Sequence, residues 1–159
     1  MRWRSWILIV LFTISLLSMW STQTLHAEES FCQQIKQETG LPATLEKGIC
    51  TIIIPREDIK ARLEGVPLPG EMLDLELSAH IIKTGKKGYL TAEFALLEKE
   101  INPVIDRVRQ SGISVSALHN HWIHEHPRIL YLHFQGSGDP VELATTVKQA
   151  VQATTVPSH

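Results

Sequence analysis

The sequence predicts an α+β fold: a mixed, mostly antiparallel sheet with one βαβ crossover and helices packed on one face. Two observations predict it. Short stretches in which apolar and polar residues alternate, bounded by glycine and proline, recur through 49–97 and again through 113–136. Apolar residues at helical spacing occur near the start of the domain, over 98–112 and at the C-terminal end. Alternation is typical of half-buried strands, and the longer spacing is typical of amphipathic helices.

Residues 1–27 have the regions of a secretory signal peptide in their usual order. Two arginines, Arg2 and Arg4, precede an apolar run over 6–20, and positions 25–27 read Leu-His-Ala, a small-residue cleavage site. The run is shorter than the roughly 20 residues that a membrane-spanning helix needs. We therefore expect a secreted or extracytoplasmic protein with no membrane span after cleavage. Retention of the leader as an N-terminal anchor is the alternative.

The remaining chain, 28–159, has the length of a single compact domain. It carries 13 Lys and Arg residues against 17 Asp and Glu, a net charge of −4, and it has no long run of like charge. This balance argues against nucleic acid or an anionic membrane as a partner. The partners that we expect are a small molecule, a cell-wall saccharide or an envelope protein.

Cys32 and Cys50 are the only cysteines of the chain, and both lie in the part expected to be exported. In an oxidising compartment such a pair is more often a disulfide than two free thiols. Because the chain has no Cys-x-x-Cys motif, we expect a structural staple between the first helix and the first strand and no redox centre. Closing a loop of this length stabilises the fold by about 3 kcal/mol in the chain-entropy model.

The first half of the domain reads as one helix followed by four strands. Ser30 caps a short helix that Gly40 ends. The expected strands lie at 49–54, 59–64, 73–83 and 88–97. The stretch 84–88 should join the last two as a hairpin with a loop, not as a tight two-residue turn.

The second half changes from strand to helix and back again. Apolar residues at helical spacing predict a helix that Gly112 ends, and strands follow at 113–121 and 128–136. Asp139 and Pro140 then mark the cap and the first position of a final helix. The strand at 88–97, the helix and the strand at 113–121 should form a right-handed parallel crossover.

Five of the eight histidines gather between positions 117 and 134. They are His119, His121, His124, His126 and His133. Alternation places Ile113, Val115, Ala117, His119 and His121 on one face of the first strand, and Ile129, Tyr131, His133 and Gln135 on one face of the second. If His119 pairs with Tyr131, the side chains of His119, His121 and His133 converge. A register shifted by one residue would place His133 on the opposite face.

Three imidazoles on adjacent strands suit zinc or another divalent transition metal. Glu125 is the nearest candidate for a fourth ligand or a general base, and Asn120 could orient water or substrate. This pattern predicts a metal-binding protein, with a metal-dependent hydrolase or lyase as the enzymatic form of the hypothesis. The simpler interpretation is that the histidines are hydrogen-bonded polar groups near a sheet end, with His124 and His126 solvated in the turn.

A second hypothesis is a non-catalytic cell-envelope module that contacts a protein or a saccharide through the hairpin tip. Trp122 is the only tryptophan of the expected mature chain, and at an exposed turn beside Arg128 it would form a contact patch. Arg56 is a further candidate, because an arginine after a strand could clamp a carboxylate or a phosphate. A solvated strand end is the simpler interpretation of that residue.

Several separated motifs occur in an order that resembles one family. They are Glu-Ile-Asn-Pro-Val at 100–104, Ala-Leu-His-Asn-His at 117–121, Pro127-Arg128 and His133-Phe134, preceded by Ile-Pro-Arg-Glu-Asp at 54–58 and a Gly-Val segment at 65–66. The chain resembles the LppY/LpqO-like family, exported bacterial proteins with a domain of unknown function. The resemblance implies export, a shared fold and importance of His119, Asn120, His121 and His133, but no reaction. The chain departs from the family in having one copy of a unit that some members carry twice, and in its cysteine pair.

Overall fold

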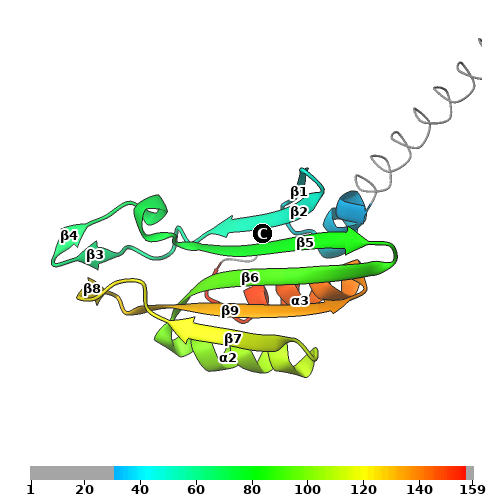
Figure 1. The fold of residues 1–159 in the computed structure, drawn as a ribbon. Helices are drawn as coiled ribbons and strands as arrows, with labels where there is room; N and C mark the ends of the chain where they lie inside the picture. Colours follow the sequence, from blue (N-terminus) through cyan, green and yellow to red (C-terminus); the bar gives the residue numbers. More distant parts are fainter. Residues whose placement is uncertain (1–30, 157–159) are drawn as a thin grey trace, which may run out of the picture.

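The computed structural model describes residues 31–156, which form two sheets with helices on one side (Figure 1). The signal peptide expected at 1–27 lies outside the described residues. One sheet has six strands in the order β1-β2-β5-β6-β9-β7, and the other has three in the order β4-β3-β8. The strands are β1 (Ala43–Glu46), β2 (Ile49–Pro55), β3 (Arg62–Leu63), β4 (Val66–Pro67), β5 (Glu76–Thr84), β6 (Lys87–Leu97), β7 (Ser114–His119), β8 (Glu125–His126) and β9 (Ile129–Gly138). The α+β prediction is confirmed.

The helices pack against one face of the six-stranded sheet. One helix covers 31–39, α2 covers Glu98–Gln110 and α3 covers Pro140–Gln152, with a short 3-10 helix η1 at Gly70–Leu73. Buried side chains of the strands and of all three α-helices form one apolar core between the two layers. Asp139 caps α3 as predicted, since its carboxylate accepts hydrogen bonds from the first turn of the helix. None of the helices in 31–156 has the length and apolarity that crossing a membrane requires.

The predicted crossover is present at β6, α2 and β7. Both β6 and β7 pair with β9 in antiparallel fashion, and β9 lies between them. The two strands joined by α2 are therefore parallel to each other, separated by one strand. This topology brings β7 and β9, the two strands that carry the histidines, side by side.

The hairpin turns are tighter than the sequence suggested. Thr84 pairs with Lys87, so β5 and β6 are joined by a two-residue turn, and the predicted longer loop is wrong. Gly85 has a φ of 62°, which glycine adopts without steric cost. The strand predicted at 59–64 is also too long, because positive φ at Glu64 and Gly65 turns the chain at once into β4. Both central residues at positive φ are typical of a type I′ turn.

Strand β1 was not predicted. It pairs with β2 through a turn at Lys47 and Gly48, both at positive φ. The usual sequence signals of such turns are Asn-Gly and Asp-Gly, so a Lys-Gly turn is easily missed. The four residues of β1 form one edge of the six-stranded sheet.

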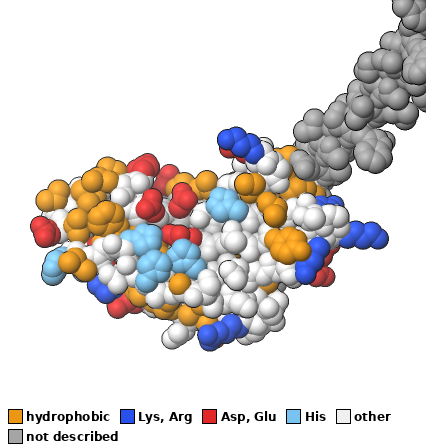
Figure 2. Space-filling view, viewed as in Figure 1, with side chains coloured by type: hydrophobic (Ala, Val, Ile, Leu, Met, Phe, Trp, Pro, Cys, Tyr) orange, Lys and Arg blue, Asp and Glu red, His pale blue; other side chains and the backbone are white. Residues whose placement is uncertain are grey.

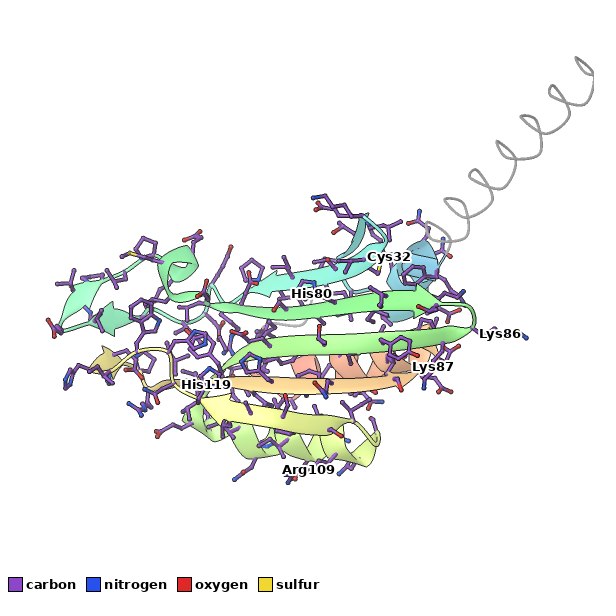
Figure 3. All side chains as sticks on the ribbon, in the orientation of Figure 1. Cys32, His80, Lys86, Lys87, Arg109 and His119 are labelled. Atoms are coloured by element: carbon purple, nitrogen blue, oxygen red, sulfur yellow. A yellow bond between two sulfur atoms is a disulfide. The ribbon has the colours of Figure 1, made fainter. Side chains whose placement is uncertain are left out.

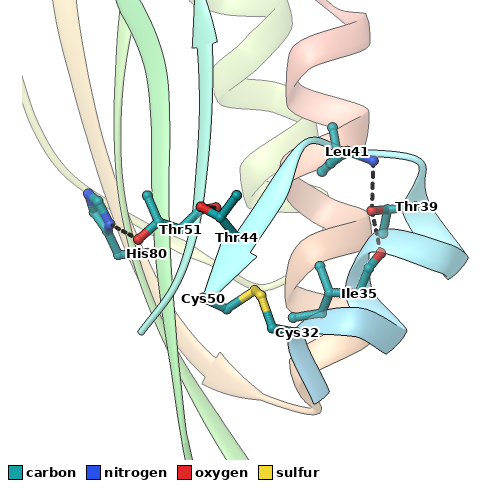
Figure 4. The surroundings of a disulfide bond; sticks show 8 residues. All are labelled: Cys32, Ile35, Thr39, Leu41, Thr44, Cys50, Thr51 and His80. Carbon is teal, nitrogen blue, oxygen red and sulfur yellow. Dashed lines mark hydrogen bonds between the residues drawn. A yellow bond between two sulfur atoms is a disulfide. The ribbon is translucent and has the colours of Figure 1, made fainter. Parts of the chain in front are cut away.

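The expected disulfide joins Cys32 and Cys50 (Figure 4). Cys32 lies on the helix at 31–39 and Cys50 on β2, and both sulfurs are buried in the main core. The bond therefore fixes the first helix to the sheet. The part of the chain that the structure describes holds no free cysteine.

Candidate metal site

The face of the six-stranded sheet opposite the helices, here called the open face, has two different parts. At one end it is covered by the segments around Ile59 and Leu73, which pack with β6 and β9 into a second apolar cluster. That cluster consists of Ile59, Ala61, Leu73, Leu75, Ala95, Ile129 and Tyr131, with Leu68, Leu97 and Trp122 packed against it. Beyond the cluster, polar side chains dominate, and several histidines gather beside acidic groups (Figure 2).

Two of the three predicted metal ligands lie on neighbouring strands in the expected register. His119 pairs with Tyr131, and His133 pairs with Ala117, so His119 and His133 are diagonal neighbours on β7 and β9. His119 is the last residue of β7 (Figure 3). The prediction that the strand continues to 121 is wrong, and His121 comes from the loop that follows.

The face assignment within β7 was also wrong, because of a β-bulge between Val115 and Ala117. Val115 pairs with Phe134 and packs against the main core, whereas Ala117 pairs with His133 on the open face. The extra residue, Ser116, changes the parity of the alternation. The bulge therefore lets one short strand contribute an apolar residue to the core and His119 to the open face.

The three imidazoles converge as predicted. One ligand nitrogen from each of His119, His121 and His133 lies within 4.8 Å of the other two. The rings of His119 and His133 are stacked at 5.0 Å and 9°, and those of His119 and His121 are 5.0 Å apart. His119 and His121 are exposed and His133 is half-buried, so a ligand can reach them from solvent.

Glu93 is the acidic partner of this cluster, and the sequence analysis did not select it. It lies on β6 directly opposite His133. Its carboxylate oxygens are 3.7 Å from Nε2 of His121 and 3.5 Å from Nε2 of His133. The signal was the strand alternation of β6, which places Glu93 among the residues opposite the core-facing Ala92 and Phe94.

A small pocket adjoins the histidines on the side of Glu93. It has a volume of about 280 Å³ and is lined by Asp74, Glu76, Ser78, Glu93 and His121. The pocket is thus lined by three carboxylates and by one of the three imidazoles, that of His121. The pocket is large enough for a small ligand and its lining is polar.

Tyr131 forms the floor beneath His121. The two rings are stacked at a centroid distance of 3.5 Å and an angle of 5°. The hydroxyl of Tyr131 donates a hydrogen bond to the main-chain oxygen of Leu73. Burial, together with the negative charges of Asp74 and Glu93, raises the pKa of Tyr131 to about 12, so the phenol is neutral at physiological pH.

The two catalytic candidates do not lie where the sequence suggested. The Asn120 amide donates to the main-chain oxygen of Trp122 at 2.6 Å and shapes the turn after β7. The Glu125 side chain is 1% exposed, and the described ligand group contains the three histidines without it. Neither Glu125 oxygen has a hydrogen-bond partner among residues 31–156, and its closest cation is Arg128, 3.5 Å away. The carboxylate that the structure places beside two of the histidines is that of Glu93.

The hairpin tip is not the tryptophan surface that the second hypothesis required. Trp122 packs against the second apolar cluster, and its indole nitrogen is buried without a partner in the described part of the chain. The apolar residue that the tip does expose is Ile123, at 67%. Arg128 is half-exposed and forms the ion pair with Glu125. His124 and His126 are exposed, as the simpler interpretation expected.

Arg56 is buried and fully used by the protein, so the clamp hypothesis is wrong. Its guanidinium donates to Asp58 (2.9 Å, twice), to Glu100 (2.9 and 3.0 Å), to the main-chain oxygen of Ala95 (2.7 Å) and to Thr155 (3.3 Å). Hydrogen bonds from Arg56, opposed by burial, lower the pKa of Asp58. Burial raises the pKa of Glu100, but hydrogen bonds from Arg56, Thr155 and Leu97 outweigh it and the net shift is downward. The group ties the end of β2, the start of α2 and the C-terminal segment together.

Comparison with known proteins identifies the chain at the level of a family. No curated protein and no solved structure matches it. One family model, the Domain of Unknown Function (DUF1259), matches residues 33–153, which is well over half of the chain and spans both sheets and all the histidines on the open face. The chain therefore belongs to this family of uncharacterised domains.

Proposed function

We propose that this protein binds a divalent transition metal through His119, His121 and His133. The observation that carries the proposal is the convergence of three imidazole nitrogens within 4.8 Å on a solvent-accessible face. Zinc, copper, nickel and iron accept neutral imidazole ligands, whereas calcium and magnesium prefer oxygen. The donor set therefore favours a transition metal, with zinc the first candidate.

The rings need only a small rearrangement to close on an ion. Zinc–imidazole bonds of about 2.0–2.1 Å place two nitrogens about 3.3 Å apart in a tetrahedral site. No two of the three nitrogens are more than 4.8 Å apart, so the rings would move inward by at most about 1.5 Å. Side-chain rotation of the exposed His119 and His121 is sufficient for this, and the strands can stay in place.

Glu93 supports two forms of the proposal. As a fourth ligand it would complete a His₃Glu site, since its oxygens lie within 3.7 Å of Nε2 of His121 and of His133. As a base it would accept a proton from a metal-bound water, whose pKa zinc lowers to about 7. The second form is the metal-dependent hydrolase or lyase, with the adjoining pocket of about 280 Å³ as the place of the substrate.

We further propose that the protein is exported and belongs to the LppY/LpqO-like group. The predicted leader at 1–27, followed by the predicted single domain at 28–159, supports export. The disulfide in the described part of the chain supports it too. The ordered motifs around His119, His121 and His133 support the grouping.

Metal titration of the untagged protein tests the proposal. Calorimetric titration with Zn²⁺, Cu²⁺ and Ni²⁺, together with mass-spectrometric metal content, should give one site per chain. His119→Ala and His133→Ala should each weaken binding at least tenfold, in line with the loss of one ligand. His80→Ala is the matched control: His80 lies on the open face of β5 and contacts Thr51 outside the cluster (Figure 3). Equal affinity in all variants, or no binding at all, would refute the metal site.

A further inference from the structure

We infer that Tyr131 is a positioning residue that sets the ring of His121 for metal binding. The inference rests on the proposed metal site. It assigns a role to a buried aromatic residue that the pattern of ligands alone would not select. Its basis is the difference between the three histidines in how their main chains are held.

His119 and His133 are held by the sheet, whereas His121 is not. His119 pairs with Tyr131, and His133 pairs with residues of both β6 and β7. His121 lies two residues beyond the end of β7, and the hydrogen bond from Asn120 to the Trp122 oxygen fixes the turn but not the imidazole. A loop histidine without further support would lose side-chain entropy on binding an ion.

Tyr131 supplies that support from a rigid position. It is fully buried on β9, between Ala95 of β6 and His119 of β7. Its hydroxyl is fixed by the main-chain oxygen of Leu73, at the end of η1. One face of its ring carries the His121 ring at 3.5 Å and 5°. Through Tyr131, the second apolar cluster thus provides a rigid stacking surface for His121, the one proposed ligand that the strands do not hold.

The same contact limits where His121 can point. Its ring lies flat on Tyr131, and in this orientation Nε2 is 3.7 Å from Glu93 and the ring centroid is 5.0 Å from that of His119. Removing the phenol ring should therefore release His121 and leave a site with two imidazoles. Outer-shell groups that orient a ligand typically contribute 10–100-fold to metal affinity, and we expect a loss in that range.

Two variants of the full chain separate the ring from the hydroxyl. Tyr131→Phe retains the stacked ring and loses only the hydrogen bond to Leu73, so metal affinity should stay within about threefold of the wild type, well below the loss that removal of a ligand-orienting group causes. Tyr131→Leu removes the stacking surface and should weaken Cu²⁺ binding 10–100-fold. Electron paramagnetic resonance of the copper form should show three bound nitrogens in the wild type and in Tyr131→Phe, and two in Tyr131→Leu.

Ring-proton chemical shifts in the metal-free protein give an independent readout. Protons of His121 should be shifted upfield by the Tyr131 ring in the wild type and in Tyr131→Phe, relative to the exposed His124. They should move toward the His124 position in Tyr131→Leu. If Tyr131→Leu does not fold, the wild-type shifts decide, because unshifted His121 protons would contradict the inference by themselves.

The outcomes distinguish this inference from the proposed function. A wild type that binds copper, with a Tyr131→Leu variant that binds it equally well through three nitrogens, overturns the role of Tyr131 and leaves the metal site intact. A wild type that binds no metal overturns the site and, with it, the role assigned to Tyr131, whatever the ring shifts show. Weakened binding with two nitrogens in Tyr131→Leu alone supports both.

Discussion

Two polar clusters of this molecule differ in how their charges and hydrogen bonds are satisfied. In the Arg56 cluster, the guanidinium side chain is 0% exposed, and each of its nitrogens donates to Asp58, Glu100, Ala95 or Thr155. In the histidine cluster, the rings are exposed or half-buried, and the polar contacts of His121 and His133 within residues 31–156 are to the Glu93 carboxylate, at 3.7 and 3.5 Å.

How far the hydrogen-bonding groups of a cluster are occupied distinguishes a structural cluster from a ligand-binding one better than the types of its residues do. A buried arginine whose donors are all occupied has nothing left for a ligand, and removing it would leave the buried carboxylate of Glu100 without its cation. Imidazoles that converge without short hydrogen bonds keep their lone pairs available to a cation. The comparison therefore assigns Arg56 to the fold and is consistent with the proposed metal binding by the histidines, and each role can be tested by a substitution.

The largest effect should come from Arg56→Met. The buried carboxylate of Glu100 and the exposed one of Asp58 would both lose their cation, and breaking a buried pair such as Arg56–Glu100 typically costs about 3–5 kcal/mol. The free energy of unfolding, measured by urea denaturation, should fall by that amount. Arg62→Met is the control, because Arg62 is exposed and donates only to the Gly65 oxygen, and its effect should stay within about 0.5 kcal/mol. A loss below 1 kcal/mol in Arg56→Met would mean that the cluster is not structural.

The second effect concerns the disulfide. Replacing both Cys32 and Cys50 by serine should lower the free energy of unfolding by about 3 kcal/mol, since the unfolded chain regains the freedom of the 18-residue separation. Metal affinity should not change, because the bond lies on the helix-covered face of the sheet and the histidines lie on the other. A variant that keeps its stability but loses metal binding would contradict both halves of this expectation.

Much of the fold could be predicted because most strands obey simple alternation. The strands at 88–97 and 128–136 and the N-terminal cap of α3 follow from local patterns, and the structure confirms them; of the two registers that the sequence left open, it has the one that pairs His119 with Tyr131. The β-bulge at Ser116 could not be predicted, because an extra residue in a strand leaves no mark in composition. It is also the reason that His119 leaves the core face.

The candidate site could be predicted only as far as its three histidines. Glu93 is 26 residues from His119 in the chain and meets the cluster only because β9 lies between β6 and β7. Likewise, Arg56 and Glu100 are 44 residues apart, and the one partner that lies near Arg56 in the sequence, Asp58, does not by itself show that the guanidinium is buried with all its nitrogens occupied. The omission of Glu93 and the clamp hypothesis for Arg56 have one cause. Local sequence patterns do not show which distant residues the fold brings together.

A third substitution, Glu93→Gln, sharpens the role of the acidic partner. Loss of the negative charge beside His121 and His133 should weaken zinc binding about tenfold, within the range of groups that orient or complete a metal site. Glu76→Gln is the matched control, because Glu76 lines the same pocket and has no ion pair with a histidine in the described residues. Calorimetric titration measures both, and equal affinity in the two variants would remove Glu93 from the site.

The smallest effect on the free energy of unfolding should come from Asp58→Asn, and it should depend on pH. The folded-state pKa of Asp58 is held below its ordinary value of 3.8 by hydrogen bonds from Arg56, which outweigh the opposing effect of burial. A lowered pKa stabilises the fold above the ordinary value, and this contribution is lost as pH falls through the folded pKa. Asp58→Asn should therefore cost about 1 kcal/mol at pH 7, and this cost should shrink as pH falls below 3.8 and through the folded-state pKa of the wild-type carboxyl. Urea denaturation at pH 7 and at a series of acidic pH values measures the difference, and a cost already absent at pH 7 would show that the ionised carboxylate is not what holds Arg56 in place.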